Sequence, residues 1–163
     1  MTRISLHISY GEATRSQTAV RLGIDNTPNA AQLTAMRAVA AACFEPARVH
    51  FGVPIGVSSF YRCPELNRAI GGSRNSQHKK GEAVDLDADL YGGLTNRELF
   101  DWLRAHVPFD QLIWEFGTAE NPAWVHVSYR VTDTRGQILV ARRINGKTQY
   151  LPWQDPSPLP PAA

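Results

Sequence analysis

The most informative stretch of the sequence is Ser76-Gln77-His78-Lys79-Lys80-Gly81-Glu82-Ala83-Val84-Asp85. The chain continues with Leu86-Asp87, and residues 83–87 alternate between apolar and acidic side chains, which predicts a short strand. Because side chains alternate across a strand, Val84 and Leu86 share one face and Asp85 lies on the other. Gly81 permits a sharp turn, so we expect His78 in the loop that leads into this strand, seven residues before the Asp85 carboxylate.

A second predicted strand, residues 124–129, carries another imidazole. His126 and Ser128 lie on one of its faces, and two valines lie on the other. Two imidazoles and one carboxylate, with an open fourth position, form the ligand set of a catalytic zinc site. Two alternatives remain open at this point. A histidine between valines is equally compatible with a hydrogen-bonded core residue, and Asp87 shares the strand face of Asp85.

The other expected elements mix helices with strands. Residues 29–51 predict a helix that begins with a capping box of Asn29 and Gln32, and Pro46 should kink it or end its first part. We further expect a strand over 55–60, a helix over 64–70, a helix from Thr95 with Glu98 completing its capping box, a strand over 111–116, and a hairpin with a strand at 138–140 and the turn Asn145-Gly146. This order predicts an α+β fold, a small antiparallel sheet flanked by helices.

Length and composition leave an enzyme or a binding domain. The 163 residues suit one domain, 43% of them are hydrophobic, and the net charge of +2 is too small to indicate a nucleic-acid partner. Cys43 and Cys63 cannot make a disulfide-dense scaffold or a four-thiolate zinc site, and we expect both to be reduced. We assign residues 1–151 to one domain and residues 152–163, which hold five of the eleven prolines, to a proline-rich tail.

The sequence also carries an expectation about the compartment. Its first residues lack the apolar core, about 7–15 residues long, of a secretory signal. No run approaches the roughly 18 apolar residues of a transmembrane helix. We therefore expect a protein that stays in the cytoplasm of the producing cell and does not insert into membranes.

The stretch around His78 resembles the signature of a known family. Ser76-x-His78-x2-Gly81-x-Ala83-x-Asp85, followed by Trp124-x-His126, is similar to the motif of the M15 zinc peptidases. These include D-Ala-D-Ala carboxypeptidases and dipeptidases and the L-alanyl-D-glutamate endopeptidases of phage endolysins. Tyr61-Arg62-Cys63-Pro64-Glu65-Leu66-Asn67 resembles the family's Tyr-Arg-x-Pro-x-x-Asn segment, and residues 14–19 with 23–26 resemble its phage and prophage branch. The resemblance covers roughly residues 5–151.

The resemblance implies a role for each matching residue. His78, Asp85 and His126 would bind Zn²⁺. Glu115, eleven residues before His126, would act as general base toward the zinc-bound water and then as proton donor to the leaving amine. Arg62 would polarise the scissile carbonyl and stabilise the oxyanion. The implied fold is that of the hedgehog and D-Ala-D-Ala peptidase group.

Other residues have weaker or competing assignments. The resemblance implies that Ser76 and Gln77 bind substrate, by lining the pocket, or orient His78. In many family members an acidic residue closely precedes the second histidine, which makes Glu120 a competing base. We favour Glu115, because a strand holds a side chain more rigidly than the loop around Glu120 does. The other three histidines have no acidic or imidazole partner at useful sequence spacing, and we expect them at the surface or at helix ends: His7, His50 and His106.

The function implied by the resemblance is hydrolysis of peptide bonds in peptidoglycan stem peptides by a monomeric zinc peptidase. The phage-like N-terminal run favours a phage or prophage endopeptidase that reaches the cell wall after lysis, through a holin or in a virion. Two alternatives remain: a D,D-carboxypeptidase of the same family, and a non-catalytic zinc-binding phage structural or wall-binding module. Glu115 separates the second alternative from the enzymes, because a binding module needs no general base.

Overall fold

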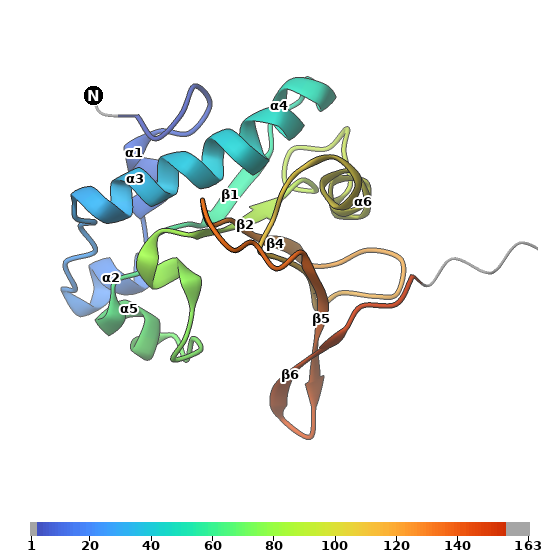
Figure 1. The fold of residues 1–163 in the computed structure, drawn as a ribbon. Helices are drawn as coiled ribbons and strands as arrows, with labels where there is room; N and C mark the ends of the chain where they lie inside the picture. Colours follow the sequence, from blue (N-terminus) through green and yellow to red (C-terminus); the bar gives the residue numbers. More distant parts are fainter. Residues whose placement is uncertain (1–2, 156–163) are drawn as a thin grey trace, which may run out of the picture.

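A computed structural model describes residues 3–155, in which a six-stranded sheet packs against helices (Figure 1). The strands follow the order β1-β2-β4-β3-β5-β6 across the sheet. Their bounds are β1 (Gly56–Ser59), β2 (Ala83–Asp87), β3 (Gln111–Glu115), β4 (Trp124–Ser128), β5 (Gln137–Ile144) and β6 (Lys147–Pro152). The α+β class predicted from the sequence is confirmed.

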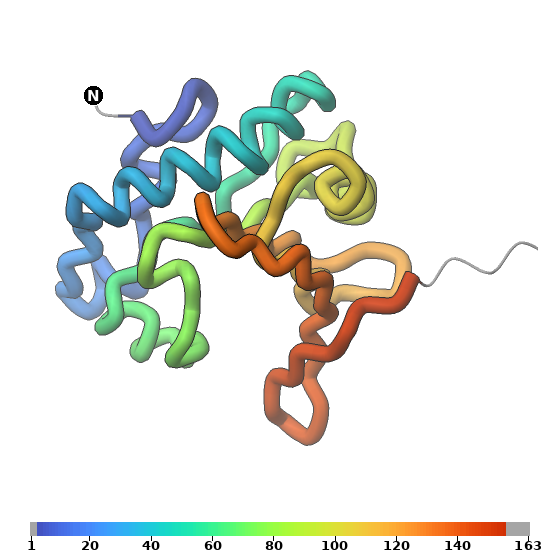
Figure 2. Tube along the Cα trace, viewed as in Figure 1, coloured from blue at the N-terminus to red at the C-terminus, as the bar shows by residue number. Residues whose placement is uncertain are grey.

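Most helices of the described chain precede the central strands. They are α1 (Tyr10–Thr14), α2 (Gln17–Leu22), α3 (Ala30–Val39), the π-helical turn η1 (Ala40–Phe44), α4 (Glu45–Phe51), α5 (Pro64–Ala69), the 3₁₀ turn η2 (Gln77–Lys80) and α6 (Asn96–His106). Figure 2 shows the chain passing from these N-terminal helices into the sheet and ending at the β5–β6 hairpin, which projects away from the helices. Among residues 3–155, no helix is long and apolar enough to cross a membrane.

The two faces of the sheet have different characters. The face that packs against the helices is apolar, and its fully buried members include Val84, Leu86, Leu112, Val125 and Val127. Burying each such side chain contributes about 1.5–3 kcal/mol. The alternate residues of β2, β3 and β4 lie on the opposite face and include several polar groups. The helices therefore cover one face and leave the other for the site described below.

The helix predicted over residues 29–51 is present, with a change of helical type inside it. Asn29 and Gln32 form the expected capping box. Ahead of Pro46 the chain widens into the π turn η1, in which the Glu45 N–H bonds to the Ala40 carbonyl, and Pro46 lies in the first turn of α4. Proline supplies no N–H to the preceding turn, so the ladder of hydrogen bonds shifts by one residue without ending.

The C-terminal hairpin also forms as expected, but its attachment to the sheet differs. Asn145 and Gly146 have φ values of 50° and 74°, as a two-residue hairpin turn of the I′ type requires. β5 pairs with β3 in the parallel direction, whereas the sequence predicts an antiparallel sheet. The segment 129–136 leaves β4 and crosses the start of β3, so β5 reaches the far side of β3 with a short connection.

The proposed boundary between domain and tail falls where β6 ends. Just beyond β6, the Trp153 ring lies 5.3 Å from the Phe100 ring of α6. Residues 156–163, most of the predicted proline-rich tail, lie outside the described residues. The assignment of 152–163 to a separate tail stays a prediction.

Candidate metal centre

The register of two antiparallel strands brings Asp85 and His126 together. The two residues are direct partners in the β2–β4 pair, so their side chains lie on the same face of the sheet. The distance from His126 Nδ1 to Asp85 Oδ1 is 2.9 Å. Both residues are buried, at 8% exposure each. The carboxylate and imidazole therefore lie next to each other on rigid strands.

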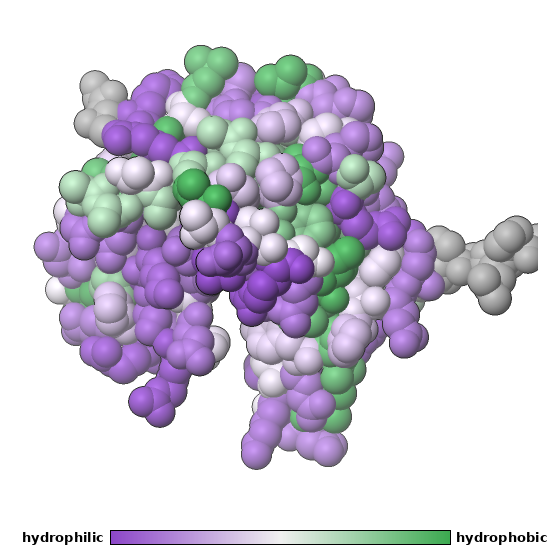
Figure 3. Space-filling model, viewed as in Figure 1, coloured by the Kyte–Doolittle hydropathy of each residue, from purple (hydrophilic) through white to green (hydrophobic). Residues whose placement is uncertain are grey.

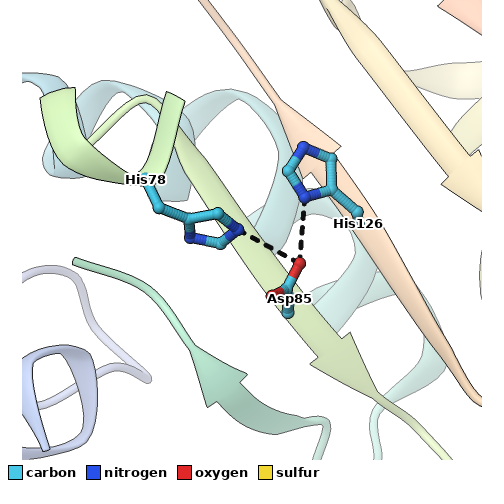
Figure 4. Close-up of side chains that lie close together, drawn as sticks. All are labelled: His78, Asp85 and His126. Carbon is cyan, nitrogen blue, oxygen red and sulfur yellow. Dashed lines mark hydrogen bonds and ion pairs between the residues drawn. The ribbon is translucent and has the colours of Figure 1, made fainter. Parts of the chain in front are cut away.

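The turn before β2 brings the second imidazole to the same point. His78 lies in η2, and its Nε2 atom is 3.3 Å from Asp85 Oδ1 (Figure 4). Gly81 ends η2 in the left-handed conformation, with φ of 74°. A Cβ at Gly81 would lie 2.6 Å from the Gln32 carbonyl oxygen of α3. Glycine is therefore needed here both for the turn and for its close packing against α3.

The hydrogen bond made by the other nitrogen of His78 determines which atom faces Asp85. The Phe60 carbonyl accepts a hydrogen bond from His78 Nδ1 at 2.6 Å, so the proton of a neutral imidazole is on Nδ1. Nε2 is buried and, among residues 3–155, meets no atom in hydrogen-bonding geometry. An unprotonated Nε2 without a hydrogen bond is the form of histidine that ligates a metal.

The spacing of the three side chains fits a zinc ion. One ligand atom from each of His78, Asp85 and His126 lies within 4.8 Å of the others. Ligands of a tetrahedral zinc at about 2.1 Å would lie about 3.4 Å apart. Three protein ligands leave a fourth position open, as in catalytic zinc sites. The three donors therefore suit a Zn²⁺ ion whose fourth coordination position is open to water or a substrate.

The electrostatics of the cluster favour the metal-binding protonation states. Burial lowers the pKa of His78, against the opposing effect of Asp85, and so favours the neutral imidazole. Burial alone would raise the pKa of Asp85, but the proximity of His78 and the hydrogen bond from His126 hold it well below its usual range. A neutral imidazole and an ionised carboxylate are the states that coordinate a divalent cation.

Glu115 occupies the neighbouring position on the same face. Ile113 of β3 pairs with His126, so Glu115, two residues further along, lies diagonally across from that imidazole. Glu115 is buried, with 6% of its surface exposed. Burial raises its pKa to about 7, helped by Asp85 and opposed by His126 and Arg62. A carboxyl group with such a pKa can both accept and donate a proton near neutral pH.

Arg62 lies on the opposite side of the cluster, in the segment between β1 and α5. Its guanidinium is half-buried, and Nε has no hydrogen-bond partner within the described part of the chain. Burial lowers the pKa of Arg62, while the carboxylates of Asp85 and Glu115 raise it. Arginine remains charged in proteins. A cation with an unpaired donor therefore faces the space beside the two carboxylates.

Asn26 holds the backbone on both sides of Arg62. Its Nδ2 donates to the carbonyl of Tyr61 at 3.1 Å, and its Oδ1 accepts from the N–H of Cys63 at 2.7 Å. Asn26 is 9% exposed and belongs to the N-terminal run whose purpose the sequence does not reveal. Sequence reasoning missed this residue, because a bond between side chain and backbone over 37 positions leaves no periodic signal.

These groups line one cleft of about 790 Å³. Arg62, the three candidate metal ligands and Glu115 contribute to its lining, as do Ser76 and Gln77. Gln77 Nε2 also donates to Glu82 Oε2 at 3.3 Å. In the space-filling view the molecule is hollowed between the lobe that carries α5 and the β5–β6 hairpin (Figure 3). The candidate site residues chosen from the sequence thus share one cleft.

The competing candidates lie elsewhere. Glu120 is exposed and does not line this cleft, and Asp87 accepts a hydrogen bond from Asn96 at 3.1 Å. His7 has an acidic partner that sequence spacing does not indicate, because its Nδ1 lies 2.6 Å from Glu45 Oε2. His50 and His106 are exposed in the last turns of α4 and α6, as expected, and their rings lie 6.4 Å apart. Sequence spacing does not reveal these pairs, because each joins elements far apart in the chain.

The two cysteines are free, which agrees with the expectation that both are reduced, and both are buried. Cys43 Sγ donates to the Pro108 carbonyl at 3.2 Å, and burial raises the pKa of its thiol to about 12. Cys63 is the N-cap of α5, where its Sγ accepts from the Leu66 N–H at 3.4 Å. Neither thiol is among the candidate metal ligands found in the described residues.

A buried His-Asp-His cluster beside an acidic residue with a raised pKa, in an open cleft, is the arrangement of a metal-dependent hydrolase. Comparison with known proteins agrees with this class. The sequence model of the family described as Peptidase M15 matches residues 6–128, and the chain belongs to this family. A search of the curated proteins finds no significant match.

Proposed function

We propose that the chain is a zinc-dependent peptidase that hydrolyses peptide bonds in peptidoglycan stem peptides. The observation that carries the proposal is the position of Glu115, buried in the same cleft as His78, Asp85 and His126. Membership of the M15 peptidase family supports peptide hydrolysis. A zinc-binding module without activity would gain nothing from a buried carboxyl group, because burying it raises its pKa at a cost in stability.

Each group in the cleft has a separate role in the proposed reaction. Zinc held by the three ligands would supply Lewis-acid chemistry, lowering the pKa of a water molecule and polarising a carbonyl. Glu115 accepts a proton from the attacking water as the new carbon–oxygen bond forms. It then donates that proton to the amine nitrogen as the carbon–nitrogen bond breaks. Arg62 stabilises the negative charge that develops on the carbonyl oxygen, because its guanidinium is already in place.

The shape of the surface favours an endopeptidase. A second hollow of about 780 Å³, lined in part by residues of α2, adjoins the cleft, and Arg62 and Ile70 line both. A recess on the far side of Arg62 offers room for a peptide that continues past the cleaved bond. Together with the phage-like N-terminal run, this supports a phage or prophage cell-wall endopeptidase. A D,D-carboxypeptidase would instead need a closed end with a group that binds the terminal carboxylate.

The test uses purified, zinc-loaded protein and purified peptidoglycan. We expect Glu115→Gln to abolish release of soluble fragments while zinc content stays at the wild-type level. The matched control is Glu120→Gln, which should keep full activity because Glu120 is exposed outside the cleft. Full activity of the Glu115→Gln protein would contradict the assigned role, and loss of its zinc would show that Glu115 is a ligand.

Mass spectrometry of the same digests identifies the bond. An endopeptidase releases peptide fragments with new amino termini inside the stem, whereas a carboxypeptidase releases single terminal amino acids. Fragments with internal cleavage support the proposal. If the only product is free D-alanine, the endopeptidase assignment is wrong and the chain is a carboxypeptidase.

A further inference from the structure

The β5–β6 hairpin forms one wall of the cleft, across the hollow from the lobe that carries α5. It lies beyond residues 6–128, the part of the chain that the family matches. The hairpin projects from the sheet (Figure 1), and four of its residues line the cleft: Gln137, Leu139, Thr148 and Tyr150. This wall therefore lies outside the matched residues, and it contributes side chains to the candidate active site.

The strand register places Tyr150 in line with Glu115. Glu115 of β3 pairs with Ala141 of β5, and Ala141 pairs with Tyr150 of β6. Residues directly opposite each other on paired strands share a face, so Tyr150 lies on the face that carries Glu115, Asp85 and His126. The residue between them is an alanine with 0% exposure, and its single methyl group leaves room for a long side chain to extend toward Glu115.

The Tyr150 hydroxyl is available as a hydrogen-bond donor. The residue is 49% exposed, and no side-chain hydrogen bond is formed by it among residues 3–155. Burial raises the pKa of the phenol, as do the nearby carboxylates of Glu115 and Asp85, while Arg62 lowers it. The proton therefore stays on the oxygen over the neutral pH range. Tyr150 lines the same cleft as Glu115, Asp85 and Arg62.

Tyr150 and Arg62 approach the cluster from opposite edges of the sheet. Arg62 follows β1, at one end of the strand order, and Tyr150 belongs to β6, at the other end. Asp85, His126 and Glu115 lie on the strands between them. A peptide bound over the cluster would therefore have a cationic donor on one side and a neutral hydroxyl donor on the other.

We propose that Tyr150 is a further catalytic residue, whose hydroxyl donates a hydrogen bond to the carbonyl oxygen of the scissile peptide bond from the side opposite Arg62. The inference rests on the proposed function. Tyr150 keeps its proton throughout and only the hydrogen bond forms, strengthening as negative charge develops on the oxygen. Its position outside the matched region makes it a contribution of the hairpin to this chain's activity.

The test compares the zinc-loaded wild-type protein with Tyr150→Phe, which removes only the hydroxyl. We expect kcat/KM for a soluble stem peptide to fall about 10- to 100-fold, mainly in kcat, with zinc content and thermal unfolding unchanged. The matched control is Tyr91→Phe, at a tyrosine that is 59% exposed and outside the cleft. Activity of Tyr150→Phe within twofold of that control, or a change confined to KM, overturns the inference.

Failure of the proposed function gives a different result. A zinc-loaded wild-type protein that does not hydrolyse the peptide overturns both the proposed function and the role of Tyr150. Hydrolysis that is lost in Glu115→Gln but retained in Tyr150→Phe overturns the role of Tyr150 alone.

Discussion

His78 Nδ1 donates a hydrogen bond to the Phe60 carbonyl at 2.6 Å, and this contact orients the imidazole that faces Asp85. Phe60 immediately precedes the Tyr61-Arg62 segment, and the Arg62 N–H in turn donates to the His78 carbonyl at 3.2 Å. Two hydrogen bonds therefore join η2 to the segment that carries Arg62, one donated from each side. A displacement of η2 would move the candidate metal ligand and the guanidinium together.

This contact leads to a prediction for His78→Asn. The asparagine amide can still donate to the Phe60 carbonyl, but it places no ligand beside Asp85. We expect the fold to be retained and zinc affinity to fall by more than the roughly 10- to 100-fold that loss of an outer-shell partner costs. Competition with a chelator measures the affinity. His106→Asn is the control, because His106 Nδ1 makes a similar bond to the Trp102 carbonyl at 2.9 Å, far from the cluster. Equal zinc affinity in both variants would reject His78 as a ligand.

A second prediction concerns Asn26, which touches neither the candidate ligands nor the cleft. Asn26→Ala leaves the buried Cys63 N–H and Tyr61 carbonyl without their partner. We expect a loss of about 1–3 kcal/mol in the free energy of unfolding, measured in urea. We also expect lower kcat at unchanged zinc content, because the backbone that carries Arg62 is no longer held on both sides. Unchanged kcat in the folded variant would show that Arg62 is positioned without Asn26.

The sequence predicts the local parts of this site better than their assembly. Alternation in residues 83–87 and 124–128 correctly places Asp85 and His126 on the polar faces of their strands, since side-chain direction depends only on neighbouring residues. The parallel β3–β5 pairing depends instead on segment 129–136, which is held by contacts between distant residues. The same reason hides Asn26 and Tyr150, whose importance comes from long-range pairing. No local pattern assigns either residue its role in the site.

The raised pKa of Glu115 predicts a pH dependence of stability. The folded pKa is about 7, above the ordinary value of 4.5, so the folded state keeps its proton over a range where the unfolded state has lost it. Stability therefore falls as pH rises from about 4.5 to 7. Metal-free protein must be used, because a bound divalent cation changes this pKa. We expect metal-free Glu115→Gln to gain up to about 3 kcal/mol over wild type between pH 4.5 and 8.

Chemical denaturation at several pH values measures this gain. Glu120→Gln provides the control, since an exposed carboxyl group should give the same difference from wild type at every pH. A pH-independent difference for Glu115→Gln would mean that the fold does not disfavour the charged form of Glu115.

The last prediction concerns Asp110, which anchors the connection to the hairpin that carries Tyr150. The Asp110 side chain is fully buried, and Arg135 Nη2 and Arg130 Nη2 donate to it at 2.6 and 3.0 Å. Burial opposes ionisation, but the hydrogen bonds from Arg135 and Arg130 outweigh it and hold the pKa of Asp110 well below its usual range. These contacts therefore stabilise the fold above about pH 4, and their contribution is lost as pH falls toward the folded pKa.

We expect Asp110→Asn to lower the free energy of unfolding by about 1–3 kcal/mol at pH 7, because it weakens the charged hydrogen bonds to two guanidinium groups that are 35% and 50% exposed. The difference from wild type should shrink below about pH 4, because the unfolded wild-type protein takes up a proton at Asp110 at a higher pH than the folded protein does. Asp101→Asn is the control, because Asp101 is 35% exposed and pairs with Arg97 and Arg104 at the surface, where such pairs contribute about 0–1 kcal/mol. Equal, pH-independent losses in the two variants would contradict the role of Asp110. If the anchoring is correct, Asp110→Asn also lowers peptide hydrolysis, because the hairpin then holds Tyr150 less firmly over the cleft.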